Sequence, residues 1–119
     1  MADVAFLVIL KVSQANQVAF DVLAQKMLDA SRVDDGLLIY EFARTGETVY
    51  GYERYTDDAA HERHQALIEP FLPELMELAE FEKIVTLTDV SESSRPGFEA
   101  MGAEIGTPIG GIAQGRLGD

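Results

Sequence analysis

The chain has 119 residues, 47% of them hydrophobic, and a formal net charge of −12 from 9 Lys and Arg against 21 Asp and Glu. This length and composition predict one globular domain with its own core. The negative charge, without any cluster of cations, argues against nucleic-acid binding and against membrane binding through a basic face. The sequence has no cysteine, so disulfides and thiolate metal sites are excluded, and we expect a cytoplasmic protein.

Residues 4–12 are apolar at both alternating sets of positions, which predicts a strand that is covered on both faces. The run is short and has no basic flank, so we expect neither a signal peptide nor a membrane span. After Ser13, a predicted N-cap, apolar residues recur at helical spacing as far as Arg32. The predicted stripe of this helix consists of Ala15, Val18, Ala19, Val22, Leu23, Met27 and Ala30.

Two strand-like runs, 37–44 and 48–55, are joined by a short turn and predict a hairpin. A helix is expected after Thr56, whose hydroxyl is the predicted cap, and a second helix from Pro73. Residues 81–90 are the predicted last strand. This order of elements predicts an α+β fold, a ferredoxin-like split βαβ arrangement with helices on one face of an antiparallel sheet.

Helices on one face leave the other face of the first strand uncovered, although both faces are apolar. We therefore expect a homodimer that packs sheet against sheet. Residues 1–90 are predicted to form this domain. Residues 91–119 carry seven of the ten glycines and are predicted to be a C-terminal extension. It is either a loose tail or a short helix from Pro96 followed by a hairpin within 104–113, packed on the same domain or on the dimer partner.

Both histidines fall in the helix that follows the hairpin. His64 lies on its apolar stripe between Ala60 and Ile68 and is predicted to point inward, whereas His61 is predicted at the edge of that face, where water reaches it. HERH does not have the spacing of the HExxH zinc motif, so no metal site is expected. Two interpretations of His64 stay open: a hydrogen-bonded core histidine, or a base that lines a cavity between helix and sheet.

The hairpin carries the other candidate polar residues. Tyrosines in such positions are usually half-buried, and one or two of them are expected to hydrogen-bond a ligand. The four are Tyr40, Tyr50, Tyr52 and Tyr55. Because Glu53 and Arg54 are adjacent in a strand, one of them must face the helices, and we expect an ion pair across strands to satisfy it.

The hairpin and this helix share one sequence pattern. It consists of a glycine before the first strand of the hairpin, an acidic-basic-aromatic triplet at the end of the second strand, and then Asp, Ala and His. Here these are Gly36, Glu53-Arg54-Tyr55, Asp57, Ala60 and His64. The pattern resembles the antibiotic-biosynthesis-monooxygenase family, over roughly residues 4–90. The resemblance implies a dimeric α+β barrel with a pocket between sheet and helices. In the family's monooxygenases that pocket holds an electron-rich aromatic, such as a quinol or an anthrone, which reacts with O₂ without a metal or another cofactor.

The resemblance also implies roles for individual residues. His64 is the expected base. The candidates for binding the substrate are Tyr40, Tyr52, Arg54 and Phe71. Large apolar residues such as Phe42, Phe71 and Met76 could instead fill the space. A haem-degrading branch of the fold places a tryptophan where His64 stands and a histidine further along, and this chain has neither, so haem degradation is not expected.

Three functions remain open at this point. The first is a cofactor-independent monooxygenase on an electron-rich aromatic. The second is a non-catalytic homodimer that binds a small molecule, and the third is an isomerase or decarboxylase that uses His64 as a base on a small ketone. Each requires only an apolar pocket with one titratable group, so the sequence does not separate them.

Overall fold

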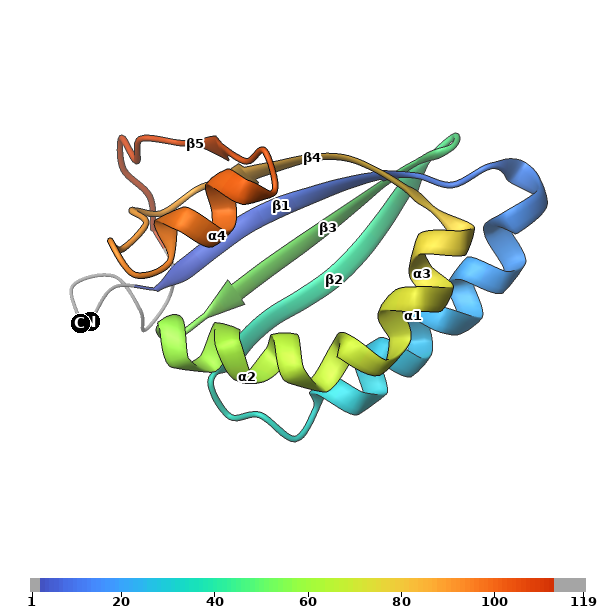
Figure 1. Cartoon of the computed structure of the whole chain (residues 1–119), viewed down its shortest axis with the longest axis horizontal. Helices are drawn as coiled ribbons and strands as arrows, with labels where there is room; N and C mark the ends of the chain where they lie inside the picture. The colour runs from blue at the N-terminus through green and yellow to red at the C-terminus, as the bar shows by residue number, and fades with distance from the viewer. Residues whose placement is uncertain (1–2, 113–119) are drawn as a thin grey trace.

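The computed structural model describes residues 3–112 (Figure 1). Its elements in chain order are β1 (Val4–Lys11), α1 (Gln17–Ser31), β2 (Leu37–Thr45), β3 (Thr48–Tyr55), α2 (Asp58–Ile68), α3 (Leu72–Leu78), β4 (Glu80–Thr86), α4 (Arg95–Ala100) and β5 (Glu104–Ile105), with 3₁₀ turns at Gln14–Asn16 and Glu69–Phe71. The strands form one sheet in the order β2-β3-β1-β4-β5, antiparallel except for the parallel pair of β4 and β5. This is the α+β ferredoxin-like arrangement that the sequence predicts.

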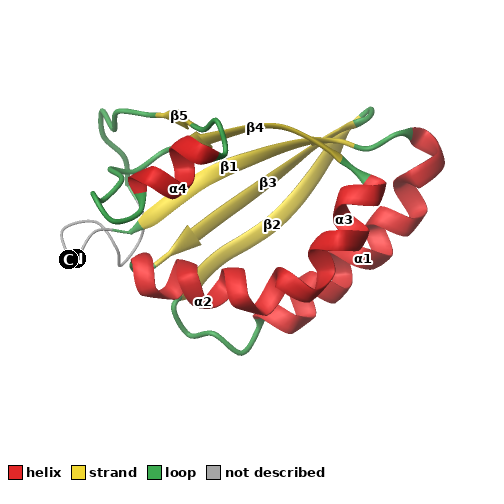
Figure 2. Ribbon diagram, viewed as in Figure 1, coloured by secondary structure: helices red, strands yellow, loops and turns green. Residues whose placement is uncertain are grey.

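The helices α1, α2 and α3 pack against one face of the sheet (Figure 2). Two apolar clusters hold this layer together. One joins β1, β3, β4, α2 and α4, and its buried members are Val4, Phe6, Tyr55, Ala60, Ile84 and Phe98. The other joins β1, β3 and α1, and its buried members are Leu10, Val12, Phe20, Ala24 and Val49. The clusters lie toward opposite ends of β1, and the sheet between them forms the floor of the site described below.

The buried stripe of α1 differs from the predicted one. Its members recur at intervals of three and four residues: Phe20, Leu23, Ala24, Met27 and Ser31. Val18 is 79% exposed and Val22 is 54% exposed, so their predicted burial is wrong. Residues two positions from Phe20 lie on roughly the opposite side of a helix. The large side chains Phe20 and Met27, seven residues apart, therefore set which side faces the sheet.

The cap of α2 also differs from the prediction. The cap is Asp57, whose carboxylate accepts a hydrogen bond from the Ala60 backbone N–H at 2.8 Å. The helix begins one residue later than Thr56 would allow. An ionised carboxylate satisfies an orphan N–H and also interacts favourably with the positive end of the helix dipole, which makes Asp57 a good cap.

The described part of the extension packs on the same chain. The hydroxyls of Ser91 and Ser94 both donate to the carboxylate of Asp58, at 2.6 and 3.0 Å. The Gly106 N–H donates to the Thr86 carbonyl and hydroxyl, and a Cβ on Gly106 would lie 2.2 Å from that carbonyl oxygen. Within the described residues, 104–112 contribute β5 alone, and residue 113 of the predicted hairpin lies outside them. The division at residue 90 stays a prediction.

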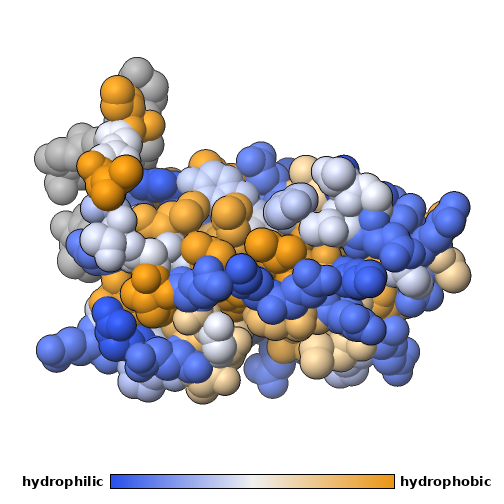
Figure 3. Space-filling view, turned by 90° about the horizontal axis from the view of Figure 1, so that it is seen from above, coloured by the Kyte–Doolittle hydropathy of each residue, from blue (hydrophilic) through white to orange (hydrophobic). Residues whose placement is uncertain are grey.

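Among residues 3–112, no helix packs on the sheet face opposite α1, α2 and α3. Leu7 and Ile9 of β1 lie beside Tyr52 and Tyr50 of β3 on this face, and Tyr50 is 41% exposed. We call it the outer face. Apolar side chains are exposed elsewhere too: Figure 3 shows a side of the molecule on which they gather in the middle, bordered by hydrophilic ones. Within residues 3–112, no helix combines the length and apolar character needed to cross a membrane.

Candidate functional site

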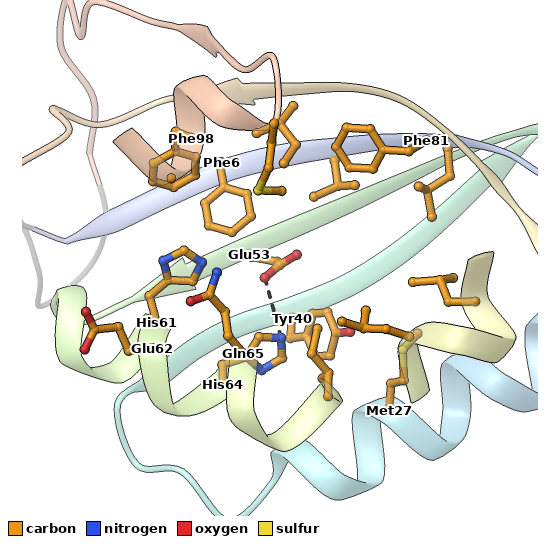
Figure 4. A pocket seen from close by; sticks show the side chains of 18 of the residues that line it. Phe6, Met27, Tyr40, Glu53, His61, Glu62, His64, Gln65, Phe81 and Phe98 are labelled. Atoms are coloured by element: carbon orange, nitrogen blue, oxygen red, sulfur yellow. Dashed lines mark ion pairs between the residues drawn. The ribbon is translucent and has the colours of Figure 1, made fainter. Parts of the chain in front are cut away.

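A cavity of about 400 Å³ lies between the sheet and the helices α2, α3 and α4 (Figure 4). Its walls are mainly apolar and include Phe6, Leu10, Met27, Phe42, Leu75 and Ile84. Polar side chains enter at one part of it, chiefly Tyr40, Glu53, His61, His64 and Gln65. Among the described residues that line it there is no Lys or Arg. The cavity therefore has the size and lining of a small-molecule site with few polar contacts.

Glu53 is the inward member of the Glu53-Arg54 pair. Strand alternation places it on the same face of β3 as Tyr55, and its side chain is only 12% exposed. The Tyr55 hydroxyl donates a hydrogen bond to the Glu53 carboxylate. Burial raises the pKa of Glu53 to about 7, because desolvation outweighs the opposing effect of that hydrogen bond. A substantial fraction of Glu53 is therefore protonated at neutral pH.

His64 faces Glu53 from α2, and it is 1% exposed. Its Nδ1 lies 3.3 Å from the Ser31 hydroxyl oxygen. Its Nε2 lies 3.6 Å from Oε1 of Glu53 and has no hydrogen-bond partner within residues 3–112. Burial, followed by the nearby His61, lowers the pKa of His64 to about 4, and Asp34 opposes this effect. The imidazole is therefore neutral at pH 7.

Glu53 and His64 together can both take and return a proton. A neutral imidazole accepts a proton, and a carboxyl group whose pKa lies near 7 is poised to donate or accept one at working pH. At 3.6 Å the two atoms are further apart than in a hydrogen bond. A buried polar atom without a partner is uncommon in folded proteins. The pair thus has the composition of a general acid–base site at the wall of the cavity.

Two tyrosines surround this pair. The Tyr40 ring lies edge-on to the His64 ring, with centroids 4.6 Å apart at 80°, and the Tyr55 ring lies 5.3 Å from it. Burial raises the pKa of both hydroxyls, and the charge of Glu53 raises them further. Both hydroxyls therefore remain protonated. Since Tyr40 lines the cavity, its O–H is available as a hydrogen-bond donor to a ligand.

His61 was expected at an edge open to water, and this expectation is wrong, because His61 is only 8% exposed. The extension covers that edge. Phe98 of α4 stacks on the His61 ring at a centroid distance of 5.6 Å and an interplanar angle of 13°, and Phe6 meets it at 5.0 Å. Desolvation lowers the pKa of His61. The cavity thus contains two imidazoles, and α4 supplies part of its wall.

The structure brings together only some of the predicted site residues. Tyr40 and His64 meet at the cavity. Tyr52 and Arg54 lie on the outer face, where the Arg54 guanidinium donates to Asp3 at 2.8 Å and to the Tyr52 hydroxyl at 3.3 Å. Because strand neighbours point to opposite faces, an inward Glu53 places both of them away from the cavity. Phe71 is half-buried in the turn between α2 and α3 and does not line the cavity.

Sequence reasoning missed three residues of the site: Glu53, Ser31 and Phe98. Alternation does place either Glu53 or Arg54 inward, but the cross-strand ion pair expected for the inward residue is wrong: the inward Glu53 meets Tyr55 and His64, whereas the outward Arg54 pairs with Asp3, just before β1. No sequence signal places Phe98 at the cavity or Ser31 behind His64, because each arrives there through the packing of a separate element. Across residues 3–112, no cluster of three or more His, Cys, Asp or Glu side chains is placed to hold a metal ion.

Comparison of the sequence with protein-family models and with curated proteins finds no significant match. Solved structures do match. MupZ from Pseudomonas fluorescens superimposes with a TM-score of 0.87 at 15% identity, over 97% of each chain. SnoaB from Streptomyces nogalater, described as a cofactor-independent oxygenase, gives 0.62 at 17% identity, over 76% of this chain and 96% of its own. A candidate antibiotic biosynthesis monooxygenase from Bacteroides thetaiotaomicron gives 0.63 at 13% identity, over 76% and 90%.

These likenesses establish the fold, and at such identities they establish nothing further. The match with MupZ leaves only a few residues of this chain uncovered, so it must include most of the extension. The fold shared with SnoaB and the Bacteroides protein supports the resemblance to the antibiotic-biosynthesis-monooxygenase family that the sequence shows.

Proposed function

We propose that this chain is a cofactor-independent monooxygenase that acts on a neutral, electron-rich aromatic, such as a quinol or an anthrone. The observation that carries the proposal is the buried pair of Glu53 and His64 at the wall of an apolar cavity. Such a pair suits the removal of a proton from a weakly acidic hydroxyl or C–H group. The absence of Lys and Arg from the described lining favours a substrate without an anionic group in this part of the cavity.

In the proposed reaction on an anthrone-like substrate, Nε2 of His64 accepts the first proton. The resulting carbanion reduces O₂, and one oxygen atom becomes bonded to carbon as a hydroperoxide, protonated by the pair. Removal of the second C–H proton then breaks the O–O bond, forming the ketone and releasing hydroxide, which leaves as water with a proton from the pair. A methylene carbon and O₂ thus give a ketone and water, and the substrate supplies all the electrons. The Tyr40 hydroxyl stabilises the anion.

We also propose that the chain acts as a homodimer joined through the outer face. Three observations support this: the apolar Leu7 and Ile9 on that face, the exposed Tyr50 beside Ile9, and the position of α1, α2 and α3 on the opposite face. An open sheet face of this composition is typical of a surface that meets a partner.

The test is O₂ consumption with a panel of hydroquinones and anthrones. We expect substrate-dependent uptake by the native chain. His64→Ala and Glu53→Gln should each lower the rate by about 100-fold or more, the lower end of what general acid–base groups contribute. Tyr52→Phe on the outer face is the matched control, because it removes a hydroxyl that hydrogen-bonds only on that side in the described residues.

Other outcomes would favour the two alternatives. An isomerase or decarboxylase would turn over in anaerobic buffer, since it needs a base but no oxygen, and the ability of Glu53 and His64 to return a proton suits an isomerisation. A non-catalytic binding dimer would be stabilised by a ligand without forming a product. Native uptake that equals the uncatalysed rate with every compound, or uptake that is unchanged in His64→Ala, would contradict the monooxygenase.

A further inference from the structure

Ser31 is the one polar member of the buried stripe of α1, and it is 1% exposed. Its hydroxyl donates a hydrogen bond to the Met27 carbonyl, one turn earlier in the helix, at 2.7 Å. A serine hydroxyl has a single proton, so once that proton is donated the oxygen can only accept. In the described structure, Nδ1 of His64 is the other polar atom within reach of this oxygen, at 3.3 Å.

This geometry favours one ring nitrogen of His64 as the site of its hydrogen. While the Ser31 proton is donated to the Met27 carbonyl, the Ser31 oxygen can only accept, and it does so when Nδ1 carries the proton of the neutral ring. The other nitrogen, Nε2, then holds a lone pair and faces Glu53 and the cavity without a hydrogen bond in the described residues. A base needs a free lone pair directed at its substrate.

We propose that Ser31 is a positioning residue that holds His64 in the Nδ1–H tautomer and so keeps Nε2 free to accept a proton from the substrate. This role rests on the proposed function for its use in catalysis, but the tautomer itself is a property of the resting protein.

The groups around His64 show why such control is needed. Glu53 and Tyr55 face it from β3, Tyr40 from β2, and His61 lies three residues before it on α2. Asp34, in the loop after α1, interacts with it electrostatically. When Glu53 is ionised, its carboxylate favours a proton on Nε2, which would turn the base into a donor. The Ser31 oxygen opposes this because it accepts a hydrogen bond when the proton is on Nδ1.

The experiment is ¹⁵N NMR of the full chain with ¹⁵N-labelled histidine. The sequence has two histidines, and a His61→Gln variant assigns the signals. At neutral pH we expect a pyrrole-type signal for Nδ1 of His64 and a pyridine-type signal for Nε2. In Ser31→Ala the two types should exchange places or average, while Ser31→Thr, which keeps the hydroxyl, should retain the native pattern. Thr86→Val is the control, because it removes another buried hydroxyl, one that bonds Gly106 and not His64.

Two results would overturn the inference: a proton on Nε2 of His64 in the native chain, or an unchanged pattern in folded Ser31→Ala. The native spectrum alone shows which nitrogen of His64 carries the proton, so the inference can be tested even if Ser31→Ala does not fold. If the substrate reaction exists, Ser31→Ala should lower kcat by about tenfold or more with KM nearly unchanged, since a base in the wrong tautomer still binds. A native Nδ1–H tautomer without any O₂ uptake would contradict the proposed function and leave the tautomer assignment standing.

Discussion

Arg54 and Glu53 are adjacent on β3 but lie on opposite faces of the sheet, and they differ in whether they have an oppositely charged partner. On the outer face, Arg54 is 16% exposed and meets Asp3, so the cation has a counter-charge. On the inner face, Glu53 is 12% exposed, and its partners are the Tyr55 hydroxyl and the neutral His64. No Lys or Arg of the described residues pairs with it. Both side chains are similarly removed from water, yet only Arg54 has an oppositely charged partner.

The difference separates a structural arrangement from a functional one. In a buried pair such as Arg54 and Asp3 each charge faces an opposite one, and removing one partner takes that counter-charge away from the other. A buried carboxyl without a counter-charge is costly when ionised, so its pKa rises toward neutrality. Groups with such shifted pKa values occur preferentially at sites of acid–base chemistry. On the inner face, Glu53 can therefore gain or lose a proton near neutral pH, whereas on the outer face Arg54 and Asp3 form an ion pair.

Breaking the outer pair should have the largest effect on stability. Arg54→Met leaves the Asp3 carboxylate, 7% exposed, without its guanidinium. We expect the free energy of unfolding to fall by about 4 kcal/mol, as is typical when one member of a buried ion pair is removed. Urea denaturation at a fixed protein concentration measures it.

The double variant Arg54→Met with Asp3→Asn is the control for this pair. It removes both charges, so it should recover much of the lost stability. A loss below about 1 kcal/mol in the single variant would place the pair among weak surface ion pairs and erase the contrast between the two faces.

The contrast between Glu53 and Arg54 also shows which features of the structure could be predicted from the sequence. Element order, hairpin and the inward position of His64 follow from periodicity, because period 2 and period 3.6 patterns are local. Which of Glu53 and Arg54 points inward also depends on strand register, and that is set by distant pairing with β1 and β2. The burial of His61 depends on Phe98, more than thirty residues along the chain. Long-range packing of this kind leaves no local pattern.

Removing the inner charge should change stability in the opposite direction. The Glu53 pKa is raised from its ordinary 4.5 to about 7 on folding. The unfolded chain therefore loses this proton at lower pH than the folded chain does, and native stability declines as pH rises from 4.5 to 7. Glu53→Gln carries no such penalty. We expect it to be more stable than the native chain by about 3 kcal/mol at pH 8 and nearly equal to it at pH 4.5.

Chemical denaturation of both chains across pH 4.5 to 8 gives this difference. The pKa of His64 is lowered to about 4, so protonation of the unfolded chain below pH 6.5 destabilises both proteins alike. Comparing them at each pH removes that contribution. A difference that does not depend on pH would show that Glu53 is charged throughout, which would contradict the mobile proton on the inner face.

The smallest expected effect concerns what covers the outer face. Tyr50 is 41% exposed there, beside Ile9, and aromatic residues are enriched among those that dominate interface energies. If the proposed dimer forms through this face, Tyr50→Ala should weaken it by about tenfold in Kd, or about 1.4 kcal/mol. Sedimentation across a dilution series measures the change. Val18→Ala is the matched control, since Val18 is 79% exposed on α1, on the other side of the sheet. Equal dimer affinities in the two variants would show that the dimer does not form through the outer face. The burial of the Arg54–Asp3 pair would then come from the single chain alone.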